Sequence, residues 1–156
     1  MTSQFLTKEG FDKLEAELEY LRTEKRKEVA QRLHEAAESS LGEFVEDPEF
    51  EAAKNEQSFV EGRIRELEIL LAGAKLIKKQ RSKNGEVQLG STVVIKEGRA
   101  KPEEYLIVGA AEANPREGKI SHASPLGEAL LGKKEGDKVE VKAPSGSFTV
   151  KVVEVK

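Results

Sequence analysis

Two long stretches of the chain carry hydrophobic residues at the three-and-four spacing that packs one helix face against a partner helix. The first stretch contains Phe11, Leu14, Leu18, Leu21, Val29, Leu33 and Ala36. If the spacing of the first four residues continued, the next positions of the stripe would be Lys25 and Glu28, which are polar. The apolar stripe therefore shifts by about four residues. A shift of this size is a stutter, which locally unwinds a coiled coil. Thr7 is the expected N-cap, and the helix is expected to end near Ser39 and Ser40.

The second stretch keeps its spacing without a break. It contains Phe50, Ala53, Gln57, Val60, Ile64, Leu67, Leu71 and Ala74. Asp47 is expected to cap this helix with Pro48 at its first position, and the helix is expected to finish near Ile77. Two such stripes joined by a short turn bury each other only by folding back, so the sequence predicts an antiparallel coiled-coil hairpin. Helices of about 30 residues, at about 1.5 Å per residue, make an arm roughly 45 Å long.

The second half of the chain has the alternating pattern of strands. Strands are predicted at 91–96, 105–108, 138–142 and 148–155. The turn at 143–146 joins the last two of these strands into a hairpin. Ser124 and Pro125 are expected to open a short helix through Leu131, which Gly132 closes.

The predicted fold class is α+β, with two parts. Residues 1–79 form the coiled-coil hairpin, with an acidic tip at 42–49. Residues 80–85 lack periodicity and are expected to be a linker, and 86–156 form a small α+β domain. The composition agrees, because 35% charged and 37% hydrophobic residues, with 5% aromatic ones, are too polar for one globule with a deep core.

Charge and residue usage exclude several classes of function. The formal net charge is -3 and the pI about 5.6, so the net charge of the chain does not favour binding to nucleic acid. The absence of Cys excludes disulfides, cysteine zinc sites and thiol nucleophiles, and two isolated histidines, His34 and His122, offer no catalytic triad. No secretion signal or apolar run of roughly 20 residues is visible, so a cytoplasmic protein without membrane contact is expected.

The turn between the two helices is the strongest candidate for a functional site. One reading is a solvated loop whose acids favour the start of the next helix. That reading explains Asp47 but not Glu43 and Glu46, which precede the helix and are candidates to offer oxygen ligands to Mg²⁺. Phe44 and Val45 are unusual in a solvated loop and indicate contact with a partner surface.

A basic cluster lies on the first helix. It consists of Lys25, Arg26, Lys27 and Arg32. One reading is a solvated helix face with salt bridges such as Glu24–Lys27 or Glu28–Arg32. The other is that the cluster contacts the phosphates of a single nucleic-acid strand.

Stretches spread over nearly the whole chain carry a family pattern. They are residues 6–11, 18–26, 49–57, 61–64, 120–121 and 124–137. In this order and spacing they resemble the Gre family of bacterial transcription elongation factors. The resemblance implies a coiled coil that enters the secondary channel of bacterial RNA polymerase and an FKBP-like C-terminal domain that docks at the channel rim.

The resemblance also implies a mechanism and site residues. The tip carboxylates of Glu43 and Glu46, with Asp47, help the polymerase hold Mg²⁺ and orient a water, so that the polymerase cleaves the 3′ end of its own backtracked nascent RNA. The chain is then a factor and not an enzyme by itself, and it is expected to be a monomer. Lys25, Arg26 and Arg32 are then the candidates for RNA contact, and Ser124, Pro125, Leu126 and Lys133 the candidates for docking on the polymerase.

The tip departs from the family pattern, which reads G-D-L-S-E-N-A-E-Y. Glu46 keeps the glutamate, whereas Glu43 stands in place of the aspartate, Val45 in place of the serine and Asp47 in place of the asparagine. An alternative function is therefore a non-cleaving Gre homologue that binds the same channel and regulates or inhibits the polymerase. A third reading is a coiled-coil adaptor or an FKBP-type prolyl isomerase, against which the few aromatic residues of the C-terminal domain argue.

Overall fold

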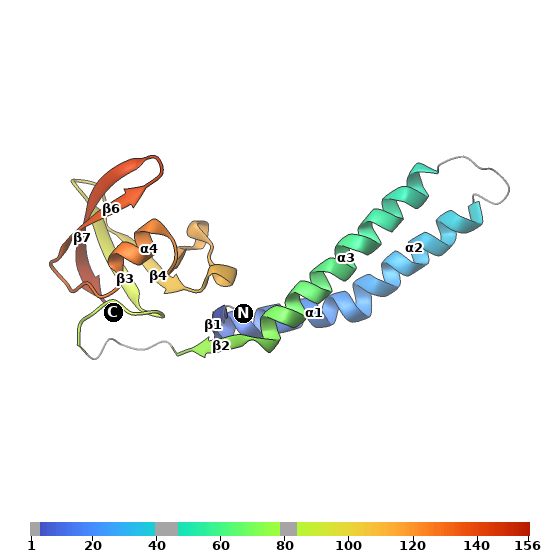
Figure 1. Cartoon of the computed structure of the whole chain (residues 1–156), viewed down its shortest axis with the longest axis horizontal. Helices are drawn as coiled ribbons and strands as arrows, with labels where there is room; N and C mark the ends of the chain where they lie inside the picture. Colours follow the sequence, from blue (N-terminus) through green and yellow to red (C-terminus); the bar gives the residue numbers. More distant parts are fainter. Residues whose placement is uncertain (1–3, 40–46, 79–83) are drawn as a thin grey trace. The chain divides into compact units, whose positions relative to one another are not determined.

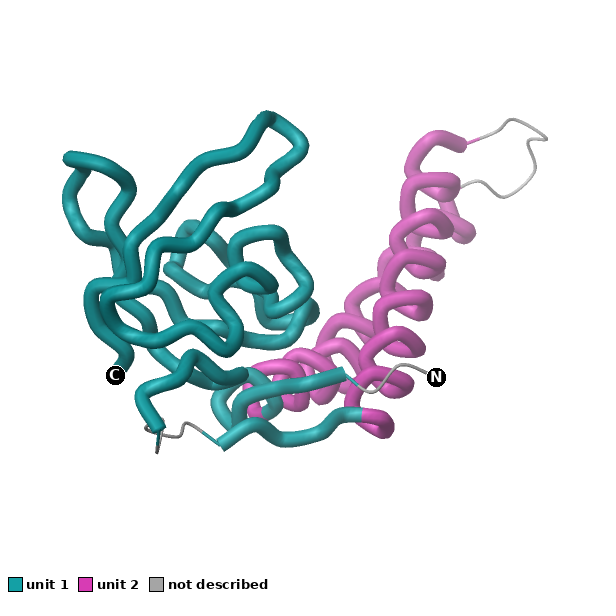
Figure 2. The backbone as a smooth tube through the Cα atoms, turned by 60° about the vertical axis from the view of Figure 1, so that its left-hand side comes forward, with its two compact units in different colours: residues 1–11, 74–156 teal, residues 12–73 magenta. Residues whose placement is uncertain are grey.

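The computed structural model describes residues 4–39, 47–78 and 84–156, in two compact units. One unit is Asp12–Gly73, and the other combines Met1–Phe11 with Ala74–Lys156 (Figure 2). No helix within the described residues is long and apolar enough to cross a membrane.

The unit Asp12–Gly73 is a helical hairpin. Its elements are helix α1 (Lys8–Tyr20), which begins in the other unit, the π-helix η1 (Leu21–Lys25), helix α2 (Arg26–Ser39) and helix α3 (Pro48–Ala72). Helices α1 and α2 run antiparallel to α3, as the two stripes predict (Figure 1). The buried seam consists of Leu18, Val29, Val60, Ile64 and Leu67, flanked by Leu14, Leu21, Leu33 and Leu71. The predicted antiparallel hairpin is confirmed.

The π-helix lies where the hydrophobic frame shifts. The backbone N–H of Arg26 donates to the carbonyl of Leu21, five residues earlier, so this turn holds one residue more than an α-turn. Leu21 and Val29 are eight positions apart, one more than a heptad, yet both pack in the seam, and Val29 is only 2% exposed. The wide turn absorbs the extra residue and returns the stripe to the seam.

Both predicted N-caps are present. The Thr7 hydroxyl accepts a hydrogen bond from the backbone N–H of Gly10 at 3.0 Å. At the start of α3, the Asp47 carboxylate accepts from the N–H of Glu49 at 3.0 Å, with Pro48 as the first helical residue. Each cap satisfies a backbone donor that the first helical turn leaves without a partner.

The predicted end of the second helix near Ile77 is wrong. Helix α3 stops at Ala72, and Gly73 is its C-cap. Strand β2 (Ala74–Ile77) follows and pairs in parallel with strand β1 (Gln4–Thr7), which the sequence did not predict. The apolar stripe continues past Gly73, which is why the helix was expected to continue, but the backbone there forms hydrogen bonds with β1 instead. Both strands belong to the unit that holds the C-terminal residues.

The C-terminal residues form a five-stranded sheet in the order β5-β4-β3-β7-β6. The strands are β3 (Thr92–Glu97), β4 (Glu103–Val108), β5 (Lys119–Ser121), β6 (Lys138–Ala143) and β7 (Gly146–Val155). Four of them were predicted, as was the β6–β7 hairpin, whereas the three-residue β5 was not. The short helix α4 (Pro125–Leu130) is confirmed, with Leu131 as its C-cap and Gly132 beyond it at φ 79°, in the left-handed region that favours glycine.

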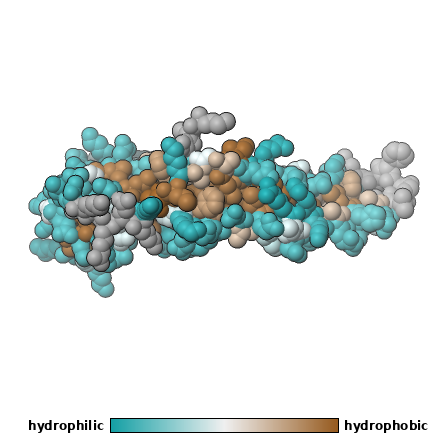
Figure 3. All heavy atoms as spheres, turned by 90° about the horizontal axis from the view of Figure 1, so that it is seen from below, coloured by the Kyte–Doolittle hydropathy of each residue, from teal (hydrophilic) through white to brown (hydrophobic). Residues whose placement is uncertain are grey.

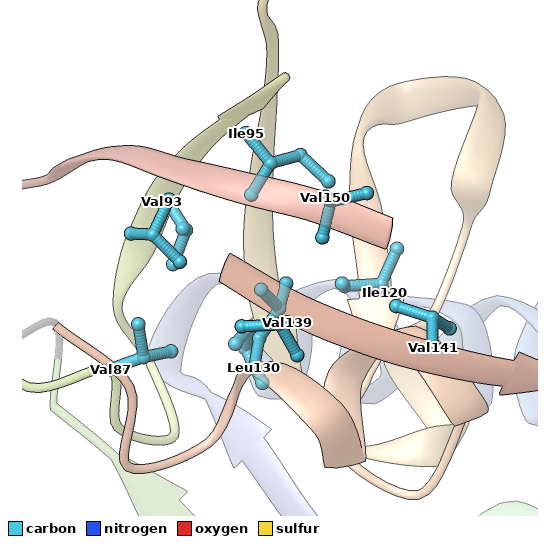
Figure 4. Packing of buried hydrophobic residues seen from close by; sticks show 10 residues of the cluster. Val87, Val93, Ile95, Ile120, Leu130, Val139, Val141 and Val150 are labelled. Carbon is cyan, nitrogen blue, oxygen red and sulfur yellow. The ribbon is translucent and has the colours of Figure 1, made fainter. Parts of the chain in front are cut away.

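One apolar core lies between the sheet and α4. The alternate residues of the strands point into it, as Figure 4 shows for Val93 and Ile95 of β3 and for Val139 and Val141 of β6. Leu130 of α4 is fully buried in the same cluster. This arrangement confirms the predicted α+β class.

A carboxylate ties the start of α1 to the C-terminal residues. Glu112, at the end of the 3₁₀-helix η2 (Ala110–Glu112), accepts hydrogen bonds from the backbone N–H of Thr7 at 2.9 Å and from the Thr7 hydroxyl. Its side chain is 6% exposed, and the Lys119 ammonium lies 4.0 Å away. A Cβ atom at Gly10 would stand 2.4 Å from the Glu112 carboxyl carbon, so only glycine leaves room for this contact.

Candidate functional site

Of the three predicted metal ligands at the tip, the structure describes Asp47, while Glu43 and Glu46, like Phe44 and Val45, lie outside the described residues. One oxygen of Asp47 is engaged by the N–H of Glu49. The helix cap is therefore a sufficient role for Asp47, and its predicted role as a metal ligand stays a prediction. In the described part of the chain, no group of three or more His, Asp or Glu side chains is placed to hold a metal ion.

The three cations predicted to contact RNA all pair with acids of the hairpin. Lys25 lies 2.8 Å from Glu56. Arg26 donates two hydrogen bonds to Glu61, at 2.8 and 2.9 Å, and Arg32 pairs with both Glu56 and Glu28. These contacts match the salt-bridge reading of this face, including the predicted Glu28–Arg32 pair. A role of these cations in RNA contact stays a prediction.

Most of these ion pairs join the two helices across the seam. Besides the pairs of the basic cluster, Arg63 of α3 donates to both oxygens of Glu17 at 2.8 and 3.1 Å, and Arg22 pairs with Glu68. The hydrogen bond from Lys25 lowers the pKa of Glu56, and the one from Arg26 lowers the pKa of Glu61. Exposed pairs such as these stabilise weakly one by one, but together they fix the register of the two helices.

Acid is expected to weaken the hairpin through these carboxylates. Because the folded pKa values of Glu56 and Glu61 lie below their ordinary value of 4.5, the contribution of the pairs is present above that pH and is lost as the pH falls through the folded pKa values. The midpoint of thermal unfolding, followed by the helical circular dichroism signal, should decline below about pH 4.5. Glu56→Gln should start lower at pH 7 and lose less on acidification.

A matched control separates these pairs from general effects of acid. Glu51 is an exposed acid of the same helix, and no ion pair joins it to another described residue. Glu51→Gln should therefore follow the wild-type profile. If the profile of Glu56→Gln also runs parallel to the wild type, the cross-helix pairs do not contribute to the stability of the hairpin.

The predicted docking residues surround the start of α4. The Ser124 hydroxyl accepts from the N–H of Gly127 at 3.1 Å and donates to the carbonyl of Ser121 at 2.7 Å, so Ser124 caps the helix. Pro125 and Lys133 are exposed, whereas Leu126 is half-buried and packs against the core. The structure thus leaves Pro125 and Lys133 as the two members with side chains available to a partner.

A small hollow beside α4, lined by both apolar and charged residues, bears on the prolyl isomerase reading. Its volume is about 170 Å³, and Tyr105, Phe148 and Leu126 contribute to its lining. That is below the roughly 300 Å³ at which ligand pockets begin. The Tyr105 hydroxyl donates to Glu103 at 2.5 Å, which, with burial, raises the pKa of Tyr105 to about 12. The hollow therefore gives no support to a proline-binding catalytic pocket.

Sequence reasoning missed two kinds of residue. Glu112 was not predicted, because nothing in its local pattern indicates a partner 105 residues earlier in the chain. The hairpin also exposes apolar side chains outside its seam, with Tyr20, Phe59 and Ile69 exposed by 51%, 76% and 66%. Figure 3 shows hydrophobic residues visible among hydrophilic ones on one face of the molecule. Phe59 and Ile69 lie outside the apolar heptad positions of the second helix. Their place in the sequence would therefore have identified them as exposed apolar residues.

Comparison with known proteins gives a concordant result over the whole chain. Residues 82–156 match the family model "Transcription elongation factor, GreA/GreB, C-term", and residues 4–76 match "Transcription elongation factor, N-terminal". Transcription elongation factor GreA of Chloroflexus aurantiacus is 49% identical over 153 residues, covering 97% of this chain and 96% of the relative. GreA of Thermoanaerobacter pseudethanolicus is 49% identical over 152 residues, with the same coverage.

Among solved structures, the chain is similar to GreA factor homolog 1 (Gfh1) of Thermus thermophilus. The two are 36% identical, with 99% of each chain covered and a TM-score of 0.44. The two family models together span nearly all of the residues, and the relatives match over almost their full length. The chain belongs to the GreA/GreB family of transcription elongation factors.

Proposed function

We propose that this chain binds bacterial RNA polymerase, inserts its coiled-coil hairpin into the secondary channel and stimulates cleavage of the 3′ end of backtracked nascent RNA. The observation that carries the proposal is the hairpin itself. Two long helices are held in register by an apolar seam and by cross-helix ion pairs, and the turn that joins them carries Glu43 and Glu46. Such a hairpin is suited to deliver carboxylates to a site in another molecule.

Each part of the chain has a separate role in this proposal. The seam and the ion pairs keep the two helices paired, and the segment that connects them carries Glu43 and Glu46. Glu43 and Glu46 would hold Mg²⁺ together with carboxylates of the polymerase, and the chemistry it would supply there is a water of lowered pKa and charge stabilisation of the leaving oxygen. The cleavage is the polymerase's own reaction, so the chain acts as a factor, as a monomer, in the compartment of the polymerase.

The donor set fits a shared metal better than a resident one. Mg²⁺ in proteins is commonly held by one or two carboxylates with substrate phosphates and waters completing its shell. Two tip carboxylates, those of Glu43 and Glu46, precede the cap residue in the sequence. The cap of the helix is Asp47. We therefore assign Glu43 and Glu46 the metal role and Asp47 the structural one.

A second candidate function is a Gre homologue that occupies the channel without stimulating cleavage. It is favoured by the tip sequence, in which Glu43, Val45 and Asp47 replace the residues of the family pattern. An additional methylene at Glu43 displaces its carboxylate, and catalytic geometry tolerates little displacement. Halted, backtracked complexes distinguish the two functions. Shortening of the RNA from its 3′ end supports cleavage, whereas intact RNA with slowed nucleotide addition supports the second function.

Docking on the polymerase is expected to depend on the exposed residues beside α4. Lys133→Glu should weaken binding to RNA polymerase by about tenfold, because a cation facing an acidic rim becomes repulsive. Pro125→Ala should weaken it less. Both side chains are exposed, so folding should be unaffected. Competition binding with labelled wild-type chain measures the effect.

The control for this prediction is the same charge reversal elsewhere in the C-terminal residues. Lys142 is exposed on β6, and Lys142→Glu should bind the polymerase within about twofold of the wild type. Equal losses for Lys133→Glu and Lys142→Glu would show that net charge, and not a surface beside α4, governs the affinity.

A further inference from the structure

Three lysines stand side by side across the C-terminal sheet. Lys151 of β7 is directly opposite Lys96 of β3 on one side and Lys138 of β6 on the other. The three strands are neighbours in the sheet (Figure 1). Their flanking residues Ile95 and Val150 are buried in the core, so the lysines occupy the opposite face of the sheet, which α4 does not cover. We call Lys96, Lys138 and Lys151 the lysine row.

The lysine row has no carboxylate partner among the residues that the structure describes. Elsewhere in the same unit lysines do find acids, with Lys119 beside Glu112, Lys134 beside Glu86 and Lys156 beside Glu104. Like charges directly opposite each other on neighbouring strands destabilise a sheet. The row therefore carries an electrostatic cost that no contact within the described chain offsets, and a bound anion would remove it.

The row borders a hollow large enough for a small ligand. Its volume is about 560 Å³, and besides the three lysines it is lined by Gly98, Gly136, Thr149, Val150, Val152 and Val153. A Cβ atom built at Gly98 or at Gly136 meets no atom within 4 Å, so the space over both glycines is open. Pockets of roughly 300–1,000 Å³ are of the size that binds small molecules.

The positive charge of the row is bounded on both sides along the strands. Glu140 lies two residues beyond Lys138 on β6, and Glu154, opposite Val94, lies beyond the row on β7. Both acids occupy the same face as the row, about 7 Å from it by the rise of two strand residues. A long polyanion that ran along the strands would meet these carboxylates, whereas a compact one would meet the lysines alone.

We propose that the lysine row binds a compact polyphosphate, such as inorganic tripolyphosphate or the triphosphate of a nucleotide. The ammonium group of lysine is a compact charge with three donors and is a common phosphate ligand in proteins, whereas arginine is favoured where two parallel bonds to a carboxylate are made. The three lysines start from neighbouring strands about 4.8 Å apart, and their long side chains can bring three ammonium groups to several phosphates held close together. This site is independent of the proposed action on RNA polymerase.

The test uses the full chain, with tripolyphosphate and ATP as separate probes, in a titration followed by amide chemical shifts at low salt. Residues of the row and of the hollow should shift with both probes, with dissociation constants within about twofold, because the phosphates are recognised. Lys151→Gln should weaken both by roughly fivefold or more, since a charge-assisted contact is lost. Lys142→Gln, on the same face of β6 but outside the row, should bind within about twofold of the wild type.

A second measurement does not depend on binding strength. Without ligand, Lys151→Gln should melt at the wild-type temperature or above, because it removes repulsion inside the row. Tripolyphosphate should raise the melting temperature of the wild type and not that of the variant. Equal weakening by Lys151→Gln and Lys142→Gln, no shift in the row, or tighter binding of a single-stranded oligouridylate or a glutamate-rich peptide than of tripolyphosphate would each overturn the proposal.

Discussion

Replacing Glu46 by Gln should abolish the stimulation of RNA cleavage, lowering its rate by about 100-fold or more. The glutamate at this position is one of the tip residues that the chain shares with the family pattern. Glutamine keeps the size of the side chain but removes the negative charge, so it cannot help to hold Mg²⁺ or orient a water as the carboxylate does. The measurement is the rate of 3′ shortening of RNA in halted, backtracked complexes at saturating factor.

Asp47→Asn is the matched control for this result. The Asp47 carboxylate accepts the N–H of Glu49, and asparagine can make the same cap, so the helix should start as before. Asp47→Asn should retain most of the activity, and Glu43→Gln should lose it. Equal losses for Asp47→Asn and Glu46→Gln would instead make Asp47 a ligand. Full activity of Glu46→Gln would remove the tip carboxylates from the mechanism.

Leu67→Ala should destabilise the hairpin by about 2–5 kcal/mol. Leu67 is 0% exposed, and it packs in the seam with Ile64 and with Leu18 of the opposing helix. Truncation removes buried apolar contacts and leaves a cavity that paired helices fill only in part. Urea unfolding followed by the helical circular dichroism signal reports the change, because the hairpin holds most of the helix in the chain.

Ile69→Ala removes a side chain of the same size from the other side of the same helix. Ile69 is 66% exposed, so the expected change is within about 0.5 kcal/mol. The binding of Ile69→Ala to RNA polymerase should then be compared with the binding of Leu67→Ala. If the two variants unfold alike, the apolar seam is not what holds the helices together.

Local signals in the sequence were sufficient for most of the hairpin. The caps at Thr7 and Asp47 depend on residues within three positions, and both are present. The shift of the hydrophobic frame between Leu21 and Val29 predicted a local change of winding, and the structure has a π-helix there. In the C-terminal residues, the strict alternation of β6 and β7 predicted both strands and their hairpin for the same reason.

Features that depend on distant partners were not predictable in this way. The stripe that reached Ala74 indicated more helix, but the segment after Gly73 pairs with β1, about 70 residues earlier in the chain. Glu112 has its partner at Thr7, which no local pattern indicates. The three-residue β5 is too short to show alternation. For the site, the sequence placed Ser124 and Pro125 at the start of a helix, but only packing shows that Leu126 belongs partly to the core.

The basic cluster shows how the same residues support two readings until their partners are known. From spacing alone, Lys25, Arg26 and Arg32 were candidates for phosphate contact or for surface salt bridges. The acids that engage them, Glu56 and Glu61, lie on the opposing helix, about 25–35 residues away in sequence. Only the antiparallel pairing brings them together, because their spacing is not that of one helix turn.

A site-specific cross-link tests the central claim most directly. The chain has no Cys, so Phe44→Cys introduces a single thiol at the tip, to which a short photoactivatable cross-linker is attached. In a halted, backtracked complex, illumination should join the tip to the 3′ end of the nascent RNA or to the polymerase residues around its active site. The same cross-linker at Lys142→Cys should not reach them. Cross-links from the tip only to the outer surface of the polymerase, or none, would contradict the account.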